Sequence, residues 1–129
     1  MTRCLLDSSF FIDLLNEAAD RKPGPAMAWL RRHSTAQLWI SPITMAEVLE
    51  GAEDREAAKA RLARYRWQGI GHIHAERVAL RQGRASLRMG ENDAWQVAVA
   101  ERLEAAIVGH DPRAFERHGG GYVDHRAQI

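Results

Sequence analysis

The sequence predicts an α/β sandwich in which helices flank a mostly parallel central sheet. Short apolar runs of strand length alternate along the chain with longer segments of helical pattern, and this alternation is typical of parallel sheets whose connections are helices. The chain has 129 residues, of which 46% are hydrophobic, enough for one domain with a single core. Because no repeat, linker or low-complexity segment interrupts the pattern, we expect one domain over residues 1–129.

The predicted strands are short apolar runs bounded by carboxylates, glycines or turns. In chain order they are Arg3–Leu6, Gln37–Ile40, Gly69–Ile73, Ala105–Val108 and an edge strand at Tyr122–Val123. In open α/β sheets, ligands bind beyond the carboxyl ends of the strands. The residues that follow each predicted strand are therefore the first candidates for a functional site.

The predicted helices begin at capping residues, and two of them end at glycines. Ser8 or Ser9 can cap the first helix, and Ser41 can cap another that has Pro42 at its first position, where the missing N–H has no partner to lose. Glycine ends a helix because it adopts left-handed backbone angles without strain. The helices are expected at Phe10–Leu15, Ala26–His33, Pro42 to a stop at Gly51, Asp54–Trp67, Ala75–Met89 with a stop at Gly90, and Asp93–Glu104 capped by Asn92, with a helical turn at Pro112–Arg117.

Several protein classes are disfavoured by patterns that the sequence lacks. No apolar run approaches the roughly 20 residues of a membrane helix. The apolar start is broken at Asp7 and Asp13 and no cleavage site follows, so we expect a soluble cytoplasmic protein. The single Cys4 cannot form an internal disulfide and lies in an apolar run, which predicts a buried thiol. There is no P-loop, dinucleotide-binding glycine motif, serine-hydrolase elbow or zinc-binding His pattern.

Two aspartates follow predicted strands. Asp7 comes directly after the first strand, and Asp111 follows Ala105–Val108 after two intervening residues. Both side chains should therefore project at the carboxyl edge of the sheet. Either one alone could be an ordinary helix cap or turn residue, but two strand-end carboxylates in one small domain favour a shared site.

Two further acidic residues lie in apolar helices. Glu47 is surrounded by apolar neighbours, and a buried carboxylate must be paired or bound to a cation; the alternative is that Glu47 faces water together with Glu50. Asp93 stands in the first turn of its helix, where the helix dipole alone stabilises a carboxylate by a few tenths to about 1 kcal/mol. Because the rest of that helix is strongly apolar, we expect Asp93 near the sheet edge rather than in solvent.

A convergence of Asp7, Glu47, Asp93 and Asp111 would require a cation. Two carboxylates about 4 Å apart repel by roughly 4 kcal/mol at the dielectric of a protein surface, so some must bind a cation or be protonated. Oxygen ligands select Mg²⁺ or Mn²⁺ rather than zinc. Such ions activate water and stabilise charge on a phosphodiester. We therefore expect these residues to be both the catalytic and the metal-binding residues of a nuclease.

The charge distribution is compatible with a polyanionic substrate. The net charge is only +1, but without the four candidate acids 18 basic residues stand against 13 acidic ones, a surplus of 5. Four arginines recur every three or four residues and so form one helical stripe: Arg77, Arg81, Arg84 and Arg88. The stripe could track phosphates, or it could be an ordinary solvated helix face.

The acidic residues lie in segments that resemble the motifs of PIN domains. LLDSSFFIDLL resembles their opening motif, and SPITMAEVLEGA resembles the second, whose inward glutamate falls on Glu47. NDAWQVAVAERLEAAIVGHDPRAF resembles the third and fourth, with acidic residues at Asp93 and Asp111 and the following hydrophobic residue at Phe115. The four motifs occur in order over nearly the whole chain, and they imply a PIN-like three-layer sandwich.

Among PIN proteins, the chain length and the EVLEGA helix are most similar to VapC-type toxins of toxin–antitoxin pairs. The resemblance implies an Mg²⁺- or Mn²⁺-dependent endoribonuclease that forms a homodimer, is held inactive by a cognate antitoxin and cleaves structured RNA. In this interpretation Asp7 and Asp93 hold the metal, Glu47 and Asp111 complete the site directly or through water, and a metal-activated water attacks the RNA phosphodiester.

The sequence departs from the family pattern at two positions. Ser9 stands where the family often has asparagine, and Gly109 stands where it usually has threonine or serine. The glycine removes a hydroxyl that would support Asp111. Ser8 or Ser9 is expected to position a ligand or a phosphate oxygen.

Three alternatives stay open at this point. The first is a structure-specific deoxyribonuclease with the same acidic site, because recognition of the 2′-hydroxyl leaves no sequence motif here. The second is a catalytically inactive PIN module that binds nucleic acid or a protein partner. The third is a small α/β protein without a nucleic-acid role, whose acidic residues are caps and surface charges.

Overall fold

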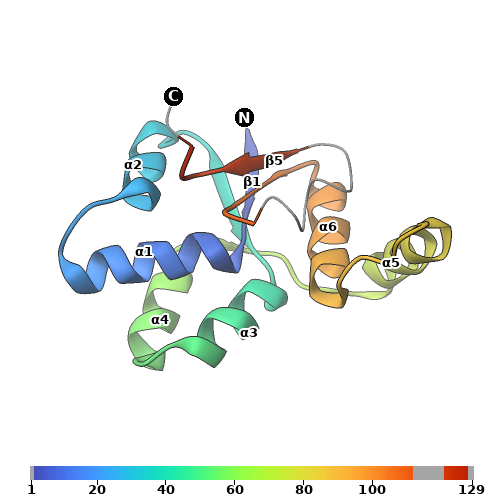
Figure 1. Cartoon of the computed structure of the whole chain (residues 1–129), viewed down its shortest axis with the longest axis horizontal. Helices are drawn as coiled ribbons and strands as arrows, with labels where there is room; N and C mark the ends of the chain where they lie inside the picture. Colours follow the sequence, from blue (N-terminus) through green and yellow to red (C-terminus); the bar gives the residue numbers. More distant parts are fainter. Residues whose placement is uncertain (1, 112–120, 128–129) are drawn as a thin grey trace.

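The central sheet is parallel throughout, as the alternation of strands and helices predicts. In the computed structural model, which describes residues 2–111 and 121–127, the strands lie in the order β3-β2-β1-β4-β5 (Figure 1). They are β1 (Arg3–Leu6), β2 (Gln37–Ile40), β3 (Arg66–Trp67), β4 (Ala106–Gly109) and β5 (Tyr122–Asp124). All four pairings are parallel, and the predicted α/β class is confirmed.

Strand β1 lies at the centre of the sheet and pairs with both β2 and β4. The register aligns Leu6 with Val108, so the residues that follow these two strands leave the sheet side by side. The N–H of Asp7 still donates to the carbonyl of Val108, at 2.8 Å. Asp7 and the turn after β4 therefore share the edge at which ligands bind in sheets of this kind.

Helices cover both faces of the sheet and complete a three-layer arrangement (Figure 1). They are α1 (Ser8–Asp20), α2 (Pro25–Arg32), α3 (Pro42–Gly51), α4 (Arg55–Leu62), α5 (His72–Arg84) and α6 (Glu91–Leu103). The first four pack on one face and the last two on the other. None of the helices in the described part of the chain is long and apolar enough to cross a membrane.

Alternating strand residues divide the core into two halves. Leu6 packs with Phe10 and Trp29 on the side of α1 to α4, whereas Leu5 and Ile107 pack against α5 and α6. This is the two-residue period of a strand whose faces are both covered. Burying a leucine or phenylalanine side chain contributes about 1.5–3 kcal/mol, which explains why the strands are apolar on both faces. The predicted burial of the Cys4 thiol is confirmed.

The helix caps follow the prediction in one case and differ in two. Ser41 caps α3, and its hydroxyl accepts from the N–H of Thr44 at 3.4 Å. Helix α1, however, is capped by Asp7 rather than by Ser8 or Ser9, and α6 begins after Gly90 rather than after Asn92. These shifts of one or two residues move carboxylates into the helix starts at the sheet edge.

The predicted helix Asp54–Trp67 is too long, and the predicted strand Gly69–Ile73 is wrong, because its first residues are not in a strand and Ile73 lies in α5. The helix ends at Leu62, and Arg66–Trp67 forms the edge strand β3 beside β2. Pairing satisfies its backbone, and the Arg66 guanidinium lies 5.8 Å from the centre of the Trp39 ring. Long-range pairing therefore overrides a strong local helix propensity.

Helix α5 also differs from its predicted bounds of Ala75–Met89. It ends at Arg84, because the chain turns back and the side chain of Gln82 accepts from the Met89 N–H and donates to its carbonyl, at 3.0 and 2.7 Å. Met89 is buried by this turn. The helical turn predicted at Pro112–Arg117 lies outside the described residues.

Candidate functional site

Asp7 ends β1 and caps α1 in a nearly buried position, 7% exposed. Its Oδ2 accepts hydrogen bonds from the hydroxyl of Ser9 at 2.9 Å and from the Ser9 N–H at 3.4 Å. Burial raises the pKa of Asp7, although the hydrogen bonds from Ser9 act in the opposite direction. Within residues 2–111 and 121–127 it forms no ion pair with Lys, Arg or His.

Glu47 and Asp93 reach the same edge from α3 and α6. Glu47 is half-buried whereas Glu50 is exposed, so the two glutamates of α3 do not share one solvent face. The amide of Asn92 donates to Glu47 Oε2 at 3.4 Å, and this contact joins α3 to the first turn of α6. Asp93 is half-buried in that turn, where the positive end of the helix dipole favours a carboxylate.

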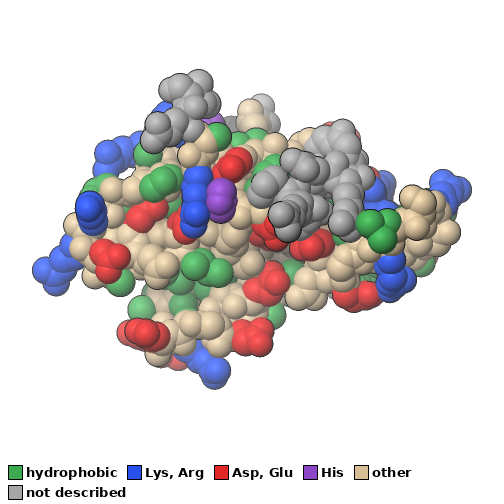
Figure 2. Space-filling model, in the orientation of Figure 1, with side chains coloured by type: hydrophobic (Ala, Val, Ile, Leu, Met, Phe, Trp, Pro, Cys, Tyr) green, Lys and Arg blue, Asp and Glu red, His purple; other side chains and the backbone are tan. Residues whose placement is uncertain are grey.

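The four predicted acids act on one another electrostatically. Burial is the leading cause that raises the pKa of Asp93 to about 6, and the charges of Asp7, Asp111 and Glu47 raise it as well. Glu47 also contributes to the raised pKa of Asp7. Figure 2 shows acidic side chains gathered on the face where α1, α3 and α6 approach one another. Carboxylates from four separate segments therefore build one zone of negative charge.

The turn after β4 lies directly against Asp7. A Cβ atom on Gly109 would lie 2.6 Å from the Ser9 hydroxyl and 3.0 Å from the Asp7 Cβ, so no larger residue fits there without movement. The Ser9 hydroxyl occupies this space and accepts from the N–H of His110 at 2.8 Å. Ser9 therefore supplies a hydroxyl at this edge of the sheet and takes the place of the hydroxyl that Gly109 lacks.

A buried glutamine that the sequence interpretation did not select joins the elements of the site. Gln96 is 1% exposed, and its Nε2 donates to Thr44 Oγ1 at 2.7 Å and to Asp7 Oδ1 at 3.4 Å. Its Oε1 accepts from the Ser41 hydroxyl at 2.6 Å. The signal was a polar residue in the apolar run AWQVAVA, because buried polar groups need partners.

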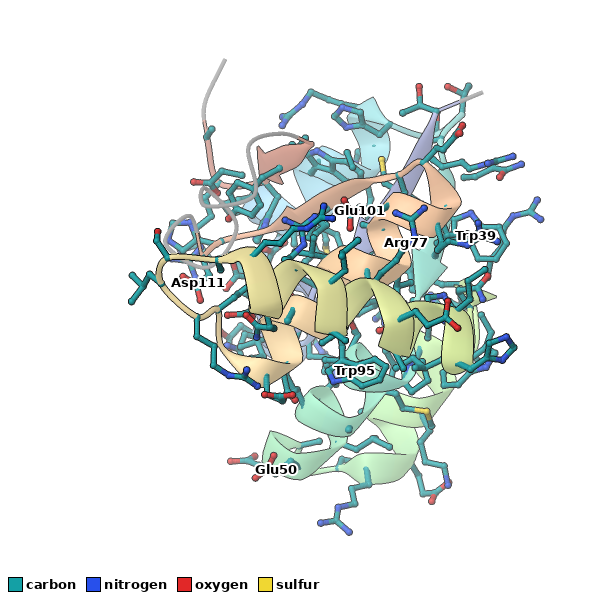
Figure 3. All side chains as sticks on the ribbon, turned by 90° about the vertical axis from the view of Figure 1, so that its right-hand side faces the viewer. Trp39, Glu50, Arg77, Trp95, Glu101 and Asp111 are labelled. Carbon is teal, nitrogen blue, oxygen red and sulfur yellow. The ribbon has the colours of Figure 1, made fainter. Side chains whose placement is uncertain are left out.

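Asp111 lies at the rim of the site. It is exposed, and its backbone N–H donates to the Tyr122 hydroxyl at 2.6 Å. Burial leads the causes that raise the pKa of Tyr122 to about 12, and the charges of Asp124, Asp7 and Asp111 raise it too. In Figure 3, Asp111 lies at the edge of the molecule opposite Trp39. Strand β5 thus contributes directly to the acidic edge, which the sequence interpretation did not foresee.

The donor chemistry of the site fits a hard divalent cation. Its candidate ligands are all carboxylate oxygens, the class that Mg²⁺ and Mn²⁺ prefer, and burial together with their mutual repulsion raises the pKa of Asp93. Within the described ranges, no three His, Cys, Asp or Glu side chains stand close enough together to hold a metal ion. The carboxylates therefore share one zone without forming a closed ligand cage.

The arginine stripe is largely neutralised by the protein itself. Arg81 pairs with Glu101 at 2.6 Å, and Arg77 lies 3.9 Å from the same carboxylate. Arg88 pairs with Glu91 at 2.8 Å. Figure 3 shows Arg77 and Glu101 facing each other between α5 and α6. Because α5 ends at Arg84, Arg88 lies outside the helix, so the predicted stripe of four arginines is wrong at that residue; the pairs of Arg77 and Arg81 with Glu101 favour a solvated helix face for the rest.

Comparison with known proteins gives a family match over most of the chain. The family model described as the PIN domain matches residues 4–121. No curated protein sequence matches the chain.

Solved structures of similar fold cover nearly the whole chain. A toxin–antitoxin complex from Klebsiella pneumoniae has a TM-score of 0.69 at 22% identity, with 95% of this chain and 97% of that chain covered. VapBC-1 from nontypeable Haemophilus influenzae gives 0.70 at 21% identity, with 98% and 100% covered. FitAcB from Neisseria gonorrhoeae gives 0.71 at 16% identity, with 95% and 97% covered. At these identities the likeness concerns the fold.

Proposed function

The chain belongs to the PIN-domain family, and from this premise we propose that it is a metal-dependent endoribonuclease and the toxin of a toxin–antitoxin pair. One observation carries the proposal. Carboxylates that follow β1 and β4 or lie in α3 and α6 stand at the carboxyl edge of the sheet, where burial and then the charges of the other three raise the pKa of Asp93 to about 6. Carboxylates that repel one another in this way are stabilised by a bound cation.

Asp7 and Asp93 are the residues we propose to hold the divalent ion, with Glu47 and Asp111 completing the site. Mg²⁺ or Mn²⁺ bound there would activate water and neutralise the charge of an RNA phosphodiester. The raised pKa values of Asp7 and Asp93 mean that the protein gives these groups no cation of its own. A bound metal ion would therefore favour the ionised form of both carboxylates.

The surrounding polar residues orient the carboxylates. Ser9 and Gln96 donate to the two different oxygens of Asp7, which fixes the plane of that carboxylate. Asn92 holds Glu47. Residues that orient metal ligands typically change metal affinity or activity by about 10–100-fold when they are replaced, so we assign Ser9, Gln96 and Asn92 as positioning residues.

The proposed partners follow from the similar structures. Those from Klebsiella pneumoniae and Haemophilus influenzae are described as a toxin–antitoxin complex and as VapBC-1, and this chain covers 97% and 100% of the matched chains. We propose a cognate antitoxin, a homodimeric state and a cytoplasmic location for this chain. The antitoxin complex and the dimer are tested by purification with and without the neighbouring gene product, followed by measurement of mass in solution, and the location is tested by cell fractionation.

The decisive experiment is cleavage of a random-sequence RNA pool by the purified, partner-free protein with Mg²⁺, with Mn²⁺ and with EDTA. Asp7→Asn and Asp93→Asn keep the side-chain shape but remove a charge. Glu50→Gln is the matched control, because Glu50 is an exposed glutamate on the same helix as Glu47. We expect metal-dependent cleavage that is lost in both aspartate variants and retained in the control.

Three other outcomes would redirect the proposal. Equal cleavage by all variants would identify a contaminating nuclease and remove the support for the site. Cleavage of a matched DNA pool but not of RNA would favour the deoxyribonuclease. No cleavage of either pool, together with no Mn²⁺ binding in a calorimeter, would favour a binding module without catalysis.

A further inference from the structure

Strand β3 and the end of α4 before it carry positive charge that the chain does not balance. Arg61, Arg64 and Arg66 lie in this segment, and no Asp or Glu occurs between Glu56 and Glu76. None of the three arginines forms an ion pair with another of residues 2–111 and 121–127. Residues 61–67, which we call the β3 strip, therefore form a cationic surface.

The arginines of the β3 strip surround aromatic side chains instead of carboxylates. The Arg66 guanidinium lies 5.8 Å from the centre of the Trp39 ring, a contact that fixes the position of an arginine and leaves its charge in place. Burial raises the pKa of Tyr65, and the charges of Arg61 and Arg64 act in the opposite direction. No carboxylate is among the causes of that shift, so the surroundings of Tyr65 are positive.

Trp67 ends the β3 strip with an exposed indole ring. It is 51% exposed, whereas the other three tryptophans are buried or half-buried. A Cβ atom on Gly69 would lie 3.8 Å from the indole Nε1, so the glycine leaves this part of the ring uncovered. A flat apolar surface is thus available to a ligand directly beside the unpaired guanidinium of Arg66.

The β3 strip lies at the side of the acidic site. Trp67 pairs with Ile40, the residue before the α3 cap, so β3 ends at the carboxyl edge of the parallel sheet. Since β3 is two strands from β1, it lies about 10 Å from the strand that Asp7 ends. In Figure 3, Trp39, which Arg66 contacts, lies on the side of the molecule away from Asp111. A strand of a few nucleotides can therefore extend from the acidic edge to this strip.

From this arrangement we infer that the β3 strip binds single-stranded RNA, with one base stacked on Trp67 and phosphates bound by Arg64 and Arg66. Surfaces that bind single strands combine a positively charged track with aromatic rings on which bases stack. The acidic edge itself repels phosphates, and Glu101 neutralises the arginines of α5. The positive charge that a polyanion requires is therefore found on the β3 strip.

Two other occupants fit the β3 strip less well. A duplex keeps its bases stacked inside the helix, so it has no base to offer to Trp67. Two copies of the strip placed face to face would bring like charges together, which costs free energy. The inference rests on the proposed ribonuclease function and names where the substrate strand is bound away from the cleaved bond.

The experiment measures binding by fluorescence anisotropy in EDTA, so that no metal-dependent cleavage occurs. Three labelled probes are compared over a range of salt concentrations: a short random-sequence single-stranded RNA, a strand of equal length whose riboses lack bases, and an RNA duplex. The variants are Trp67→Ala, Trp67→Phe and Arg66→Ala. The matched controls are Leu87→Ala, an exposed apolar residue, and Arg31→Ala, an exposed arginine of α2.

We expect Trp67→Ala to weaken binding of the single-stranded RNA by about 10-fold or more, as the loss of one stacked base would give. Binding of the abasic strand and of the duplex should stay within about 2-fold, because neither offers a base to the ring. Trp67→Phe should keep most of the affinity. Arg66→Ala should reduce the slope of log affinity against log salt by about 0.7 on both single strands, and the two controls should match the wild type.

Equal weakening of the normal and abasic strands by Trp67→Ala would show a structural role for the ring and overturn the inference, as would an unchanged affinity. A variant that becomes monomeric and binds RNA like the wild type would show that the β3 strip is a contact between copies of the chain. Failure of the proposed function looks different, since it removes cleavage with Mn²⁺ and leaves these binding ratios in EDTA unchanged.

Discussion

Two aspartates of the α1 segment, the N-cap Asp7 and Asp13 within the helix, have opposite electrostatic surroundings. Asp7 is 7% exposed and has a raised pKa caused by burial. The side chain of Asp13 is 13% exposed, but the hydrogen bond from Arg126 lowers its pKa. The difference lies in the groups that each carboxylate contacts. Asp7 accepts hydrogen bonds from hydroxyl and amide groups, whereas Asp13 binds a cation.

The Asp13 contact closes the end of the described chain onto α1. Arg126 binds both carboxylate oxygens, with Nε and Nη2 each at 2.7 Å. The Nε2 of the buried His125 lies 2.7 Å from Asp13 Oδ2, and the ring of His125 stacks edge-on against Phe10 with centroids 5.0 Å apart. A bidentate arginine–carboxylate pair is among the stronger polar contacts in proteins.

The comparison separates a structural carboxylate from a functional one. A group whose charge is balanced within the chain contributes to folding, whereas a buried carboxylate without a cation reduces the stability of the empty protein. Such a group is retained where an external ligand supplies the missing charge. The following predictions test this division, beginning with the largest expected effect.

Asp93→Asn should reduce RNA cleavage by more than about 100-fold, because replacing residues that merely orient metal ligands already costs up to about that much. The thermal midpoint in EDTA should stay equal or rise, since the variant removes a carboxylate that is repelled by three others. Cleavage assays and thermal melts on the same preparation measure both effects. A large fall in thermal midpoint would assign Asp93 to the structural class instead.

Gly109→Ala should lower cleavage by about 10–100-fold, because the new methyl group would displace Ser9 and Asp7 from their present positions. Gly83→Ala is the matched control, since nothing lies within 4 Å of a Cβ there. Rates should be measured at saturating Mn²⁺. The double variant Gly109→Ala with Ser9→Ala should lose less activity than the two single losses multiplied together, because both changes act on the same contact. Fully independent losses would show that the two residues do not act through this contact.

Asp13→Asn should lower the free energy of unfolding by about 1–2 kcal/mol, since a charged hydrogen-bonded pair is lost and the half-exposed Arg126 recovers part of its solvation. Asp20→Asn, an exposed residue of the same helix, should change little. Urea denaturation gives both values. Asp13→Asn should retain the cleavage rate per folded molecule. A loss of cleavage would mean that the Asp13–Arg126 pair also shapes the active site.

Asp93 and Asp13 have pKa shifts of opposite direction, so they should give opposite pH dependences of stability in EDTA. The native protein keeps a proton on Asp93 up to about pH 6, whereas the unfolded chain loses it near pH 4. The free energy of unfolding should therefore fall as the pH rises through this window. The lowered pKa of Asp13 contributes stability above about pH 4 that is lost as the pH falls through its native pKa.

This pH dependence is measured by urea denaturation between about pH 3 and pH 7, a range that spans both transitions. Asp93→Asn should reduce the fall as the pH rises from 4 to 6, to which the raised pKa of Asp7 also contributes, and Asp13→Asn should reduce the loss at lower pH, to which Asp124 also contributes. If both variants keep the wild-type profile, other carboxylates dominate the titration.

The sequence by itself determined the fold class and the identities of the candidate acids. Strand period, apolar helix faces and strand-end carboxylates are local patterns, so they placed Asp7, Glu47, Asp93 and Asp111 at the starts or faces of the correct elements. The same patterns failed at β3, because Arg66–Trp67 is an extended segment only when β2 lies beside it. Local propensity carries no information about such a neighbour.

Only the tertiary structure determined which groups each side chain contacts. The five residues between Asp7 and Asp13 do not indicate that Arg126 neutralises Asp13, or that Gln96 and Ser9 bind Asp7. Nor could the sequence show that β5 brings Asp124 to His110. The physical reason is that a carboxylate's energy depends on the charges and donors within a few ångströms, and these come from residues as far as 113 positions away in the sequence.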